Sequence, residues 1–307
     1  MHHIKTGGKY IRGRILEVNL AYHCNLSCSA CAHFSPICKK HFADPDKIIS
    51  ELKEFAKYYR ADCVGLLGGE PLLHPEIAGI ARLVKVTGIT KKIRVFTNGL
   101  ILWKMSDEFW KNVDEIFVSI YPGKEMSSEH LLFCKTKAKK FNVNLELLYT
   151  SYFRMPYTEI GTNNKQLTQR IYKTCQFAQR LNCYTLENGY FYKCPLALFI
   201  PMFMKNRFKN PIVDGIKATS KKDILDYLKS EEPLKSCKFC LGSVGKLFKH
   251  RQCGPANWRN FQKQKTEKLI DLEQLKILEY INPDEDFGCL KKPYPSFVAQ
   301  RAYGFYK

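Results

Sequence analysis

The chain has 307 residues, of which 45% are hydrophobic and 25% are charged. This composition excludes an intrinsically disordered chain and is long enough for one large or two smaller domains. Lysine and arginine outnumber aspartate and glutamate by 49 to 29, a basic balance that attracts anions such as nucleic acid, a phosphorylated substrate or an acidic protein. A lysine-rich surface with no partner explains the same excess.

No basic and then apolar leader begins the chain, and its longest apolar run, near residues 196–204, falls far short of the roughly 18 residues of a membrane-spanning helix. We therefore expect a cytoplasmic protein without a membrane partner. In that reducing compartment, thirteen cysteines favour metal or redox chemistry over disulfide bonds.

The first half of the chain predicts strands that alternate with helices. Strands are expected at residues 14–20, 63–67, 93–96, 115–120 and 143–149, and helices from residue 44, at 74–86 and at 127–141. In the first helix Asp44 is a candidate N-cap and Pro45 the first helical residue. This alternation predicts a parallel sheet with crossover helices, in which ligand sites lie at the carboxyl ends of the strands.

The second half has a different pattern. TLENGYFYK at residues 185–193 places Asn-Gly between two short β-type runs, which is typical of a β-hairpin. Helical periodicity returns at 220–230 and 266–281, whereas the last twenty residues have no clear pattern. We place a domain boundary near residue 170, which gives an α/β domain over residues 1–170 and a small cysteine-rich α+β domain with the hairpin over residues 171–307.

CNLSCSAC at residues 24–31 holds three cysteines, Cys24, Cys28 and Cys31, directly after the first expected strand. A structural zinc ion takes four ligands, so zinc would need a distant fourth ligand such as His33 or Cys38. A 4Fe-4S cluster held by three thiolates instead leaves one iron open to an exogenous ligand. We expect that cluster here.

This C-x3-C-x2-C loop resembles the signature of the radical S-adenosylmethionine (SAM) superfamily, and residues 12–150 resemble its partial (β/α)6 TIM-like barrel. The resemblance implies that the open iron chelates SAM, and that reductive cleavage gives a 5'-deoxyadenosyl radical that abstracts a substrate hydrogen. The family has an aromatic residue before the third cysteine, where this chain has Ala30. Tyr22 or Phe34 is therefore expected to cover the adenine.

Other stretches at the strand ends resemble the SAM-binding motifs of this family. GGEP at 68–71 resembles the motif that approaches the methionine ammonium, and TNG at 97–99 resembles the stretch beside the ribose. Ser119 is either a ribose or carboxylate ligand or an ordinary strand-end hydroxyl, and Arg154 is either a donor to the methionine carboxylate or a solvated loop arginine. The candidate cofactor-binding residues are therefore Gly68, Gly69, Glu70, Pro71, Thr97 and Asn98, which the resemblance implies, together with Ser119 and Arg154.

A second group of cysteines follows the pattern C-x13-G-x4-C and then C-x2-C, and its members are Cys175, Cys194, Cys237 and Cys240. The pattern resembles the twitch domain, a shortened SPASM extension, which implies that four thiolates hold an auxiliary 4Fe-4S cluster. Its spacing is similar to that of radical enzymes that oxidise a cyclitol alcohol. Cys183 or Cys253 remains an alternative ligand, and a zinc ribbon built from three of the four cysteines remains an alternative site.

The resemblance of the two groups implies a radical SAM oxidoreductase that abstracts hydrogen from a small substrate, with a flavodoxin-type protein as electron donor. The resemblance to the cyclitol enzymes and the basic charge favour a carbohydrate-like or anionic substrate. Dehydrogenation is the expected reaction, although epimerisation, dehydration and rearrangement use the same parts. The alternatives are crosslinking of a ribosomally made peptide and a non-enzymatic zinc or nucleic-acid-binding protein. No RNA-binding module is recognisable, so nucleic acid is not an expected partner. No catalytic acid or base is assigned.

Overall fold

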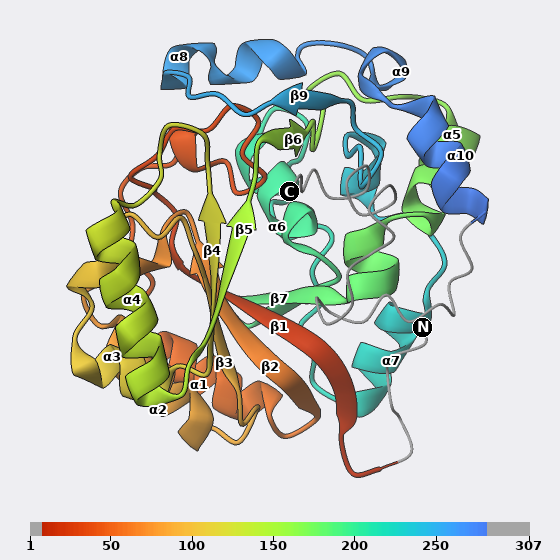
Figure 1. Cartoon of the computed structure of the whole chain (residues 1–307). Coiled ribbons are helices and arrows are strands. Elements are labelled where there is room, and N and C mark those ends of the chain that lie inside the picture. The colour runs from red at the N-terminus through yellow and green to blue at the C-terminus, as the bar shows by residue number, and fades with distance from the viewer. Residues whose placement is uncertain (1–7, 281–307) are drawn as a thin grey trace.

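The computed structural model describes residues 8–280 and is built around one seven-stranded sheet in the order β5-β4-β3-β2-β1-β7-β8 (Figure 1). The first five strands pair in parallel: β1 (Ile11–Ala21), β2 (Tyr59–Gly68), β3 (Ile93–Thr97), β4 (Glu115–Ile120) and β5 (Asn144–Tyr149). The expected α/β architecture with a parallel sheet is therefore confirmed. All five lie within a few residues of their predicted positions.

The helices that connect these strands pack against one face of the sheet (Figure 1). They are α1 (Pro45–Phe55), α2 (Ile77–Val86), α3 (Asp107–Asn112) and α4 (Ser128–Phe141). α1 begins as predicted, because the Asp44 carboxylate accepts hydrogen bonds from the backbone N–H groups of Asp46 and Lys47. The short helix α3 was not predicted from the sequence.

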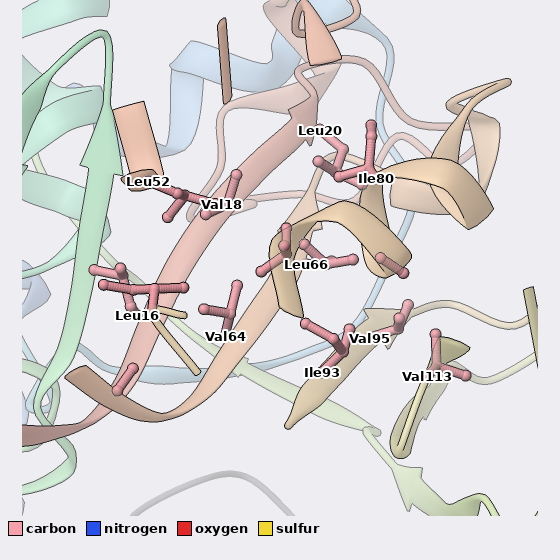
Figure 2. Packing of buried hydrophobic residues seen from close by; sticks show 14 of the residues in the cluster. Leu16, Val18, Leu20, Leu52, Val64, Leu66, Ile80, Ile93, Val95 and Val113 are labelled. Carbon is pink, nitrogen blue, oxygen red and sulfur yellow. The ribbon is translucent and has the colours of Figure 1, made fainter. Parts of the chain in front are cut away.

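The core lies between this face of the sheet and the helices (Figure 2). Val64, Leu66 and Val95 project from β2 and β3 with no exposed surface, and Ile80 of α2 is 1% exposed. Burying a side chain of this size contributes about 1.5–3 kcal/mol. The apolar face thus fixes the strands whose far ends build the site described below.

The Asn-Gly hairpin is confirmed, but it belongs to the main sheet. β7 (Cys183–Glu187) and β8 (Tyr190–Tyr192) pair antiparallel, with Asn188 and Gly189 at φ 52° and 75° in the turn. β7 also pairs in parallel with β1 at Ile15, Leu16 and Glu17. The hairpin covers the backbone edge that β1 would otherwise expose, so the sheet continues past residue 170.

The remaining helices are α5 (Lys165–Lys173), α6 (Pro195–Phe203), α7 (Lys221–Lys229), α8 (Pro255–Trp258), α9 (Thr266–Leu269) and α10 (Leu272–Tyr280), with a π-helical segment at Gln176–Leu181. Short 3-10 helices span Ser35–Ile37, Pro71–Leu73, Leu102–Lys104, Lys235–Lys238 and Arg259–Gln262. The apolar run near 196–204 is the buried helix α6, and the expected helix at 266–281 is divided into α9 and α10. The last twenty residues lie outside the described part of the chain.

β6 (Tyr152–Arg154) and β9 (Leu247–Lys249) form a separate two-stranded antiparallel sheet, which was not predicted. It ties the segment after β5 to the C-terminal part of the chain. Between residues 8 and 280, no helix is both long enough and apolar enough to cross a membrane.

Candidate active site

A cavity of about 370 Å³ lies at the carboxyl ends of the parallel strands, a volume within the usual range for small-ligand sites. Its wall includes strand-end residues from β2, β3 and β4: Gly68, Gly69, Thr97, Asn98 and Ser119. Cys24, Cys28 and Cys31 border the same cavity. The structure therefore brings the three-cysteine loop together with most of the residues that were predicted to bind SAM.

The three thiols of the loop lie close enough to influence one another. Burial, the largest cause, raises the pKa of the Cys24 and Cys28 thiols to about 12, and the neighbouring Cys31 sulfur adds to both increases. The Cys24 sulfur accepts hydrogen bonds from Leu26 N at 3.4 Å and from Asn98 Nδ2 at 3.6 Å. Thiols in such surroundings stay protonated on their own, and a bound metal would hold them as thiolates.

The surroundings of His33 indicate whether the cavity wall suits a bound polar group. Its Nε2 atom is buried and has no hydrogen-bond partner among the described residues, although the ring borders the cavity. Burial lowers the pKa of His33 to about 4, so the ring is neutral. A buried polar atom that lacks a partner beside three thiols fits a polar group bound in the cavity, as an iron–sulfur cluster with SAM would be.

The ligands of a 4Fe-4S cluster lie farther apart than the ligands of a single metal ion, because they bind different irons. Within residues 8–280 no three His, Cys, Asp or Glu side chains converge on one metal ion. The cysteines of a 4Fe-4S cluster bind different irons and stand apart from one another.

The two glycines of GGEP are required by the packing of β2 against β1. A Cβ atom on Gly68, which has φ 133°, would lie 2.1 Å from the backbone oxygen of Ala21, and one on Gly69 would lie 2.1 Å from that of His23. Gly69 N donates to Ala21 O at 2.6 Å. The close approach anchors the start of the cysteine loop, whereas the sequence suggested only a close approach to the ligand.

Glu70 and Pro71 lie beside the cavity and are not among the residues that line it. The buried Glu70 carboxylate accepts hydrogen bonds from Thr97 Oγ1 at 2.6 Å and Asn98 N at 2.8 Å. Burial raises its pKa to about 7. Glu70 thus joins the ends of β2 and β3 and positions Asn98, whose Nδ2 donates to Asn25 Oδ1 at 2.6 Å.

Arg154 lines the cavity from β6 and is not a solvated loop residue. Its side chain is 10% exposed, and Nη1 donates to the Gly245 carbonyl at 2.8 Å and pairs with Asp271 at 3.5 Å. Arg154 therefore connects the cavity wall to the C-terminal part of the chain. Ser119 is a residue of β4 on the same wall.

The structure places the two aromatic residues expected over adenine elsewhere. The Tyr22 hydroxyl donates to Glu187 at 2.8 Å, and Phe34 is fully buried against Tyr157 and Trp258, so neither borders the cavity. The aromatic residues on the wall are Phe96, Tyr121, Tyr152, Phe153 and Phe177. Sequence reasoning missed them because they lie in or after different strands and share no motif.

The second group of cysteines also comes together in space. Cys175 precedes the π-helical segment, Cys194 caps α6, and Cys237 and Cys240 lie in and after a 3-10 helix. Burial raises the pKa of each thiol, and the Cys175 sulfur adds to the increase at the other three. These four residues can offer thiolates to a second group of the same kind.

The two alternative ligands lie in other surroundings. Cys183 is a buried residue of β7 that contacts Glu17 and Tyr184. Cys253 lies beside the first cysteine loop, since its backbone N–H donates to Ser27 O at 2.8 Å and its sulfur affects the pKa of Cys28.

The cavity extends from the first cysteine group to the loops of the second. Phe177, Gly242 and Ser243 form part of its wall. Gly242 N donates to the Cys240 sulfur at 3.2 Å, and the Ser243 hydroxyl accepts from the backbone N–H of Gln176, next to Cys175. One cavity is thus bordered by the first cysteine group and by residues that lie next to the second.

Comparison with known proteins identifies the region that carries the first group. Residues 18–146 match the model of the Radical SAM superfamily. A protein of Methanocaldococcus jannaschii, named as a glycyl-radical enzyme activating enzyme, is 32% identical over 119 residues, which cover 38% of this chain and 44% of that protein. The GTP 3',8-cyclase of Trichodesmium erythraeum is 31% identical over 100 residues, 31% of this chain and 30% of the cyclase.

Solved structures with similarity to this chain include BtrN in complex with AdoMet and 2-DOIA, with a TM-score of 0.42 and 11% identity over 95% of this chain and 97% of that one. A structure of anSMEcpe with bound AdoMet has a TM-score of 0.40 and 13% identity over 59% and 71% of the two chains. This chain spans less than half the length of the curated relatives that it matches. The matched region, residues 18–146, contains the three-cysteine loop, the whole of β2, β3 and β4 and parts of β1 and β5, so it is this part of the chain that is similar to radical SAM proteins.

Proposed function

We propose that this protein is a radical SAM oxidoreductase that oxidises an alcohol of a small substrate held between two iron–sulfur clusters. The observation that carries the proposal is the shared cavity, which Cys24, Cys28 and Cys31 border on one side and Phe177 and Ser243 on the other. A substrate in this cavity would lie between the first cysteine group and the loops that carry the second. The curated relatives include an activating enzyme and a cyclase, so the oxidoreductase class depends on the second cysteine group.

The residues that would hold each group follow from their positions. The first three cysteines would hold one cluster, the residues at the strand ends would contact SAM, and Cys175, Cys194, Cys237 and Cys240 would hold a second cluster. When bound, the first cluster with SAM supplies a 5'-deoxyadenosyl radical that abstracts hydrogen, and the second supplies an acceptor for the electron that remains. Oxidation of an alcohol removes one hydrogen atom, one electron and one proton in all.

The chain itself orients and encloses the substrate. Glu70 fixes Thr97 and Asn98 at the ends of neighbouring strands, and so fixes the wall against which SAM would lie. Phe96, Tyr121 and Phe153 supply apolar wall area, which excludes the water that would compete with the substrate. The protein therefore contributes the orientation of the bound groups and the exclusion of water from the cavity.

The polar part of the wall fits a hydroxylated or anionic substrate. Ser119, Thr150 and Ser243 offer hydroxyl groups. Arg154, although its Nη1 is bonded to Gly245 and Asp271, adds a positive charge to the wall that favours an anion. A sugar, an aminocyclitol or a nucleotide sugar has this chemistry. The excess of 49 basic over 29 acidic residues would favour such a ligand, and would equally attract a flavodoxin-type electron donor with an acidic surface.

The test separates hydrogen abstraction from completion of the oxidation. Anaerobically reconstituted protein should bind about eight irons per chain, two cubes of four, and should cleave SAM to 5'-deoxyadenosine. Replacing Cys24, Cys28 and Cys31 with alanine should remove about half of the iron and all cleavage. Replacing Cys237 and Cys240 should leave SAM cleavage and deuterium transfer from the substrate, but should abolish oxidised product.

The substrate probe is a panel of deuterated aminocyclitols and nucleotide sugars, scored by deuterium in 5'-deoxyadenosine. Cys134→Ala is the matched control, because this buried cysteine of α4 belongs to neither group and should leave iron content unchanged. Tightly bound zinc without iron–sulfur absorbance contradicts the proposal. Oxidised product formed at the wild-type rate by a folded Cys237 and Cys240 double variant contradicts the electron-acceptor role.

A further inference from the structure

A C-terminal segment lies across the first cysteine loop. After β9 pairs with β6, the backbone N–H of His250 donates to Ser151 O at 2.9 Å, which turns the segment toward the loop. Ser29 N then donates to Arg251 O at 2.9 Å, and Cys253 N to Ser27 O at 2.8 Å. Residues 250–253 therefore pair with residues 27–29 like a short antiparallel strand, centred on a bridge between Cys28 and Gln252.

Two side chains of this segment meet the sulfur of Cys28. His250 Nε2 lies 3.1 Å from Cys28 Sγ, and Gln252 Nε2 donates to the same sulfur at 3.4 Å. These two residues are 222 and 224 positions away from Cys28 in the chain. By contrast, the Cys24 sulfur receives its donors from its own loop and from Asn98 of the barrel.

Both side chains are held in place by other contacts. The His250 ring stacks on Tyr121 at 4.6 Å with an interplanar angle of 15°, and it meets Phe153 edge-on at 5.0 Å. Gln252 Oε1 accepts from Ser27 N at 2.6 Å, which directs the amide nitrogen toward the sulfur. Because the two donors are already oriented, little free energy is spent on rearranging them when negative charge develops on the Cys28 sulfur.

The donors of His250 and Gln252 suit a thiolate at Cys28 better than a neutral thiol. Beside a neutral thiol, an unprotonated His250 Nε2 would accept a hydrogen bond from the thiol at 3.1 Å or from Gln252 Nε2 at 3.3 Å, and would donate none to the sulfur. A thiolate can only accept, and it takes hydrogen bonds from both nitrogens when His250 carries its proton on Nε2. Hydrogen bonds to cluster sulfurs are among the factors that set the reduction potential, because they favour the state with more negative charge.

We propose that His250 and Gln252 are positioning residues that raise the reduction potential of the cluster held by Cys24, Cys28 and Cys31 through their hydrogen bonds to the Cys28 sulfur. The inference rests on the proposed cluster at this loop. It makes the C-terminal segment a determinant of how readily the cluster accepts the electron that SAM cleavage consumes.

The test measures a potential and does not depend on a substrate. The full chain is reconstituted anaerobically and titrated with reductant under electron paramagnetic resonance, and the barrel cluster is recognised as the signal that changes when SAM is added. His250→Phe keeps an aromatic ring against Tyr121 and removes the donor, so its midpoint should be more negative than that of the wild type. His250→Gln, which can restore a donor near the Nε2 position, should return the midpoint toward the wild-type value.

A matched control separates a sulfur effect from mere attachment of the segment. Trp258 Nε1 donates to the backbone oxygen of Cys28 at 3.1 Å and not to its sulfur, so Trp258→Phe should leave the midpoint unchanged. If His250→Phe fails to hold a cluster, Gln252→Leu removes the second donor from the same sulfur and should give the same negative shift.

The possible failures are distinguishable. A wild-type protein without a SAM-sensitive signal contradicts the proposed function, and with it this inference. A SAM-sensitive signal with the same midpoint in the wild type, His250→Phe and Gln252→Leu contradicts the inference alone, and assigns the segment a purely structural role.

Discussion

At the ends of β1 and β2 the two backbones approach so closely that a side chain has no room. Gly68 and Gly69 satisfy this requirement, and Gly69 also bonds to Ala21 O. The motif therefore shapes the cysteine loop through backbone packing before any ligand binds. This reason is invisible in the sequence, which shows two glycines but not what lies opposite them.

Gly69→Ala should destabilise the protein and reduce its iron content. The added Cβ would lie 2.1 Å from His23 O, and overpacking of this kind costs about 1–3 kcal/mol. Anaerobic denaturant unfolding and iron analysis measure the two effects. Gly79→Ala is the control, because Gly79 lies in α2 with no atom near its added Cβ, and it should stabilise the helix by up to about 1 kcal/mol. Equal iron content and stability in Gly69→Ala and the wild type would show that the loop tolerates the methyl group.

Glu17 of β1 links stability to pH. Burial, the largest cause, raises the pKa of its carboxyl from 4.5 to about 8, although Thr185 Oγ1 donates to it at 3.3 Å. Between these two pH values the folded protein binds a proton that the unfolded chain has lost. The contribution of Glu17 to the free energy of unfolding therefore falls as the pH rises from about 4.5 to about 8, and is constant above that range.

Glu17→Gln should remove this dependence. The variant should match the wild type near pH 5 and exceed its free energy of unfolding near pH 9, where each unit of the pKa shift corresponds to about 1.4 kcal/mol. Denaturant unfolding at a series of pH values provides the measurement. Glu54→Gln, at an exposed position of α1, should follow the wild-type curve. A wild-type slope in Glu17→Gln would show that other groups cause the pH dependence.

Helix α1 and the hairpin show what can be predicted at the scale of elements. Asp44, Pro45 and the Asn-Gly turn were identified from the sequence, because each acts through its own local backbone. The parallel strands were also predicted, since their burial leaves continuous apolar runs. Helix α6 was missed because it is buried almost all round and so has no amphipathic period, and β6 was missed because its three residues pair with a strand far along the chain.

Asp44→Ala should lower the free energy of unfolding by about 1 kcal/mol, because the carboxylate caps two backbone N–H groups at the start of α1. Asp44→Asn keeps a capping oxygen and should lose only a few tenths of that amount. Chemical denaturation of the three proteins provides the comparison. Equal losses in both variants would show that charge, and not the cap, is what Asp44 contributes.

On the scale of the whole molecule, the cysteine groups and strand-end motifs could be predicted, but their common cavity could not. The three-cysteine loop and the strand ends lie at one edge of a sheet, a position that follows from the alternation of elements. No pattern connects His250 to Cys28 across 222 residues, nor Ser243 to the wall of the cavity. Those contacts depend on how the second half folds back.

A fragment of residues 1–170 should fail to fold as a stable monomer. It would lack β7, which pairs with β1, and an unpaired strand edge promotes association with other chains. It would also lack the segment that covers Cys28. Sedimentation and circular dichroism of the fragment, beside the full chain under the same anaerobic conditions, test this expectation. A soluble, cooperatively unfolding monomer would show that the parallel sheet is independent of the hairpin.

The return of residues 250–253 to the first cysteine loop also affects how the protein is made. The ribosome releases Cys28 more than 200 residues before His250 and Gln252, so the loop leaves the exit tunnel without its cover. Iron and sulfide delivered to the growing chain would meet solvent-exposed thiols, because the backbone pairing at Ser27 and Ser29 does not yet exist. A cluster bound at this loop would therefore gain its cover only after residues 250–253 have been translated, and until then the thiols would stay open to factors that deliver iron and sulfide.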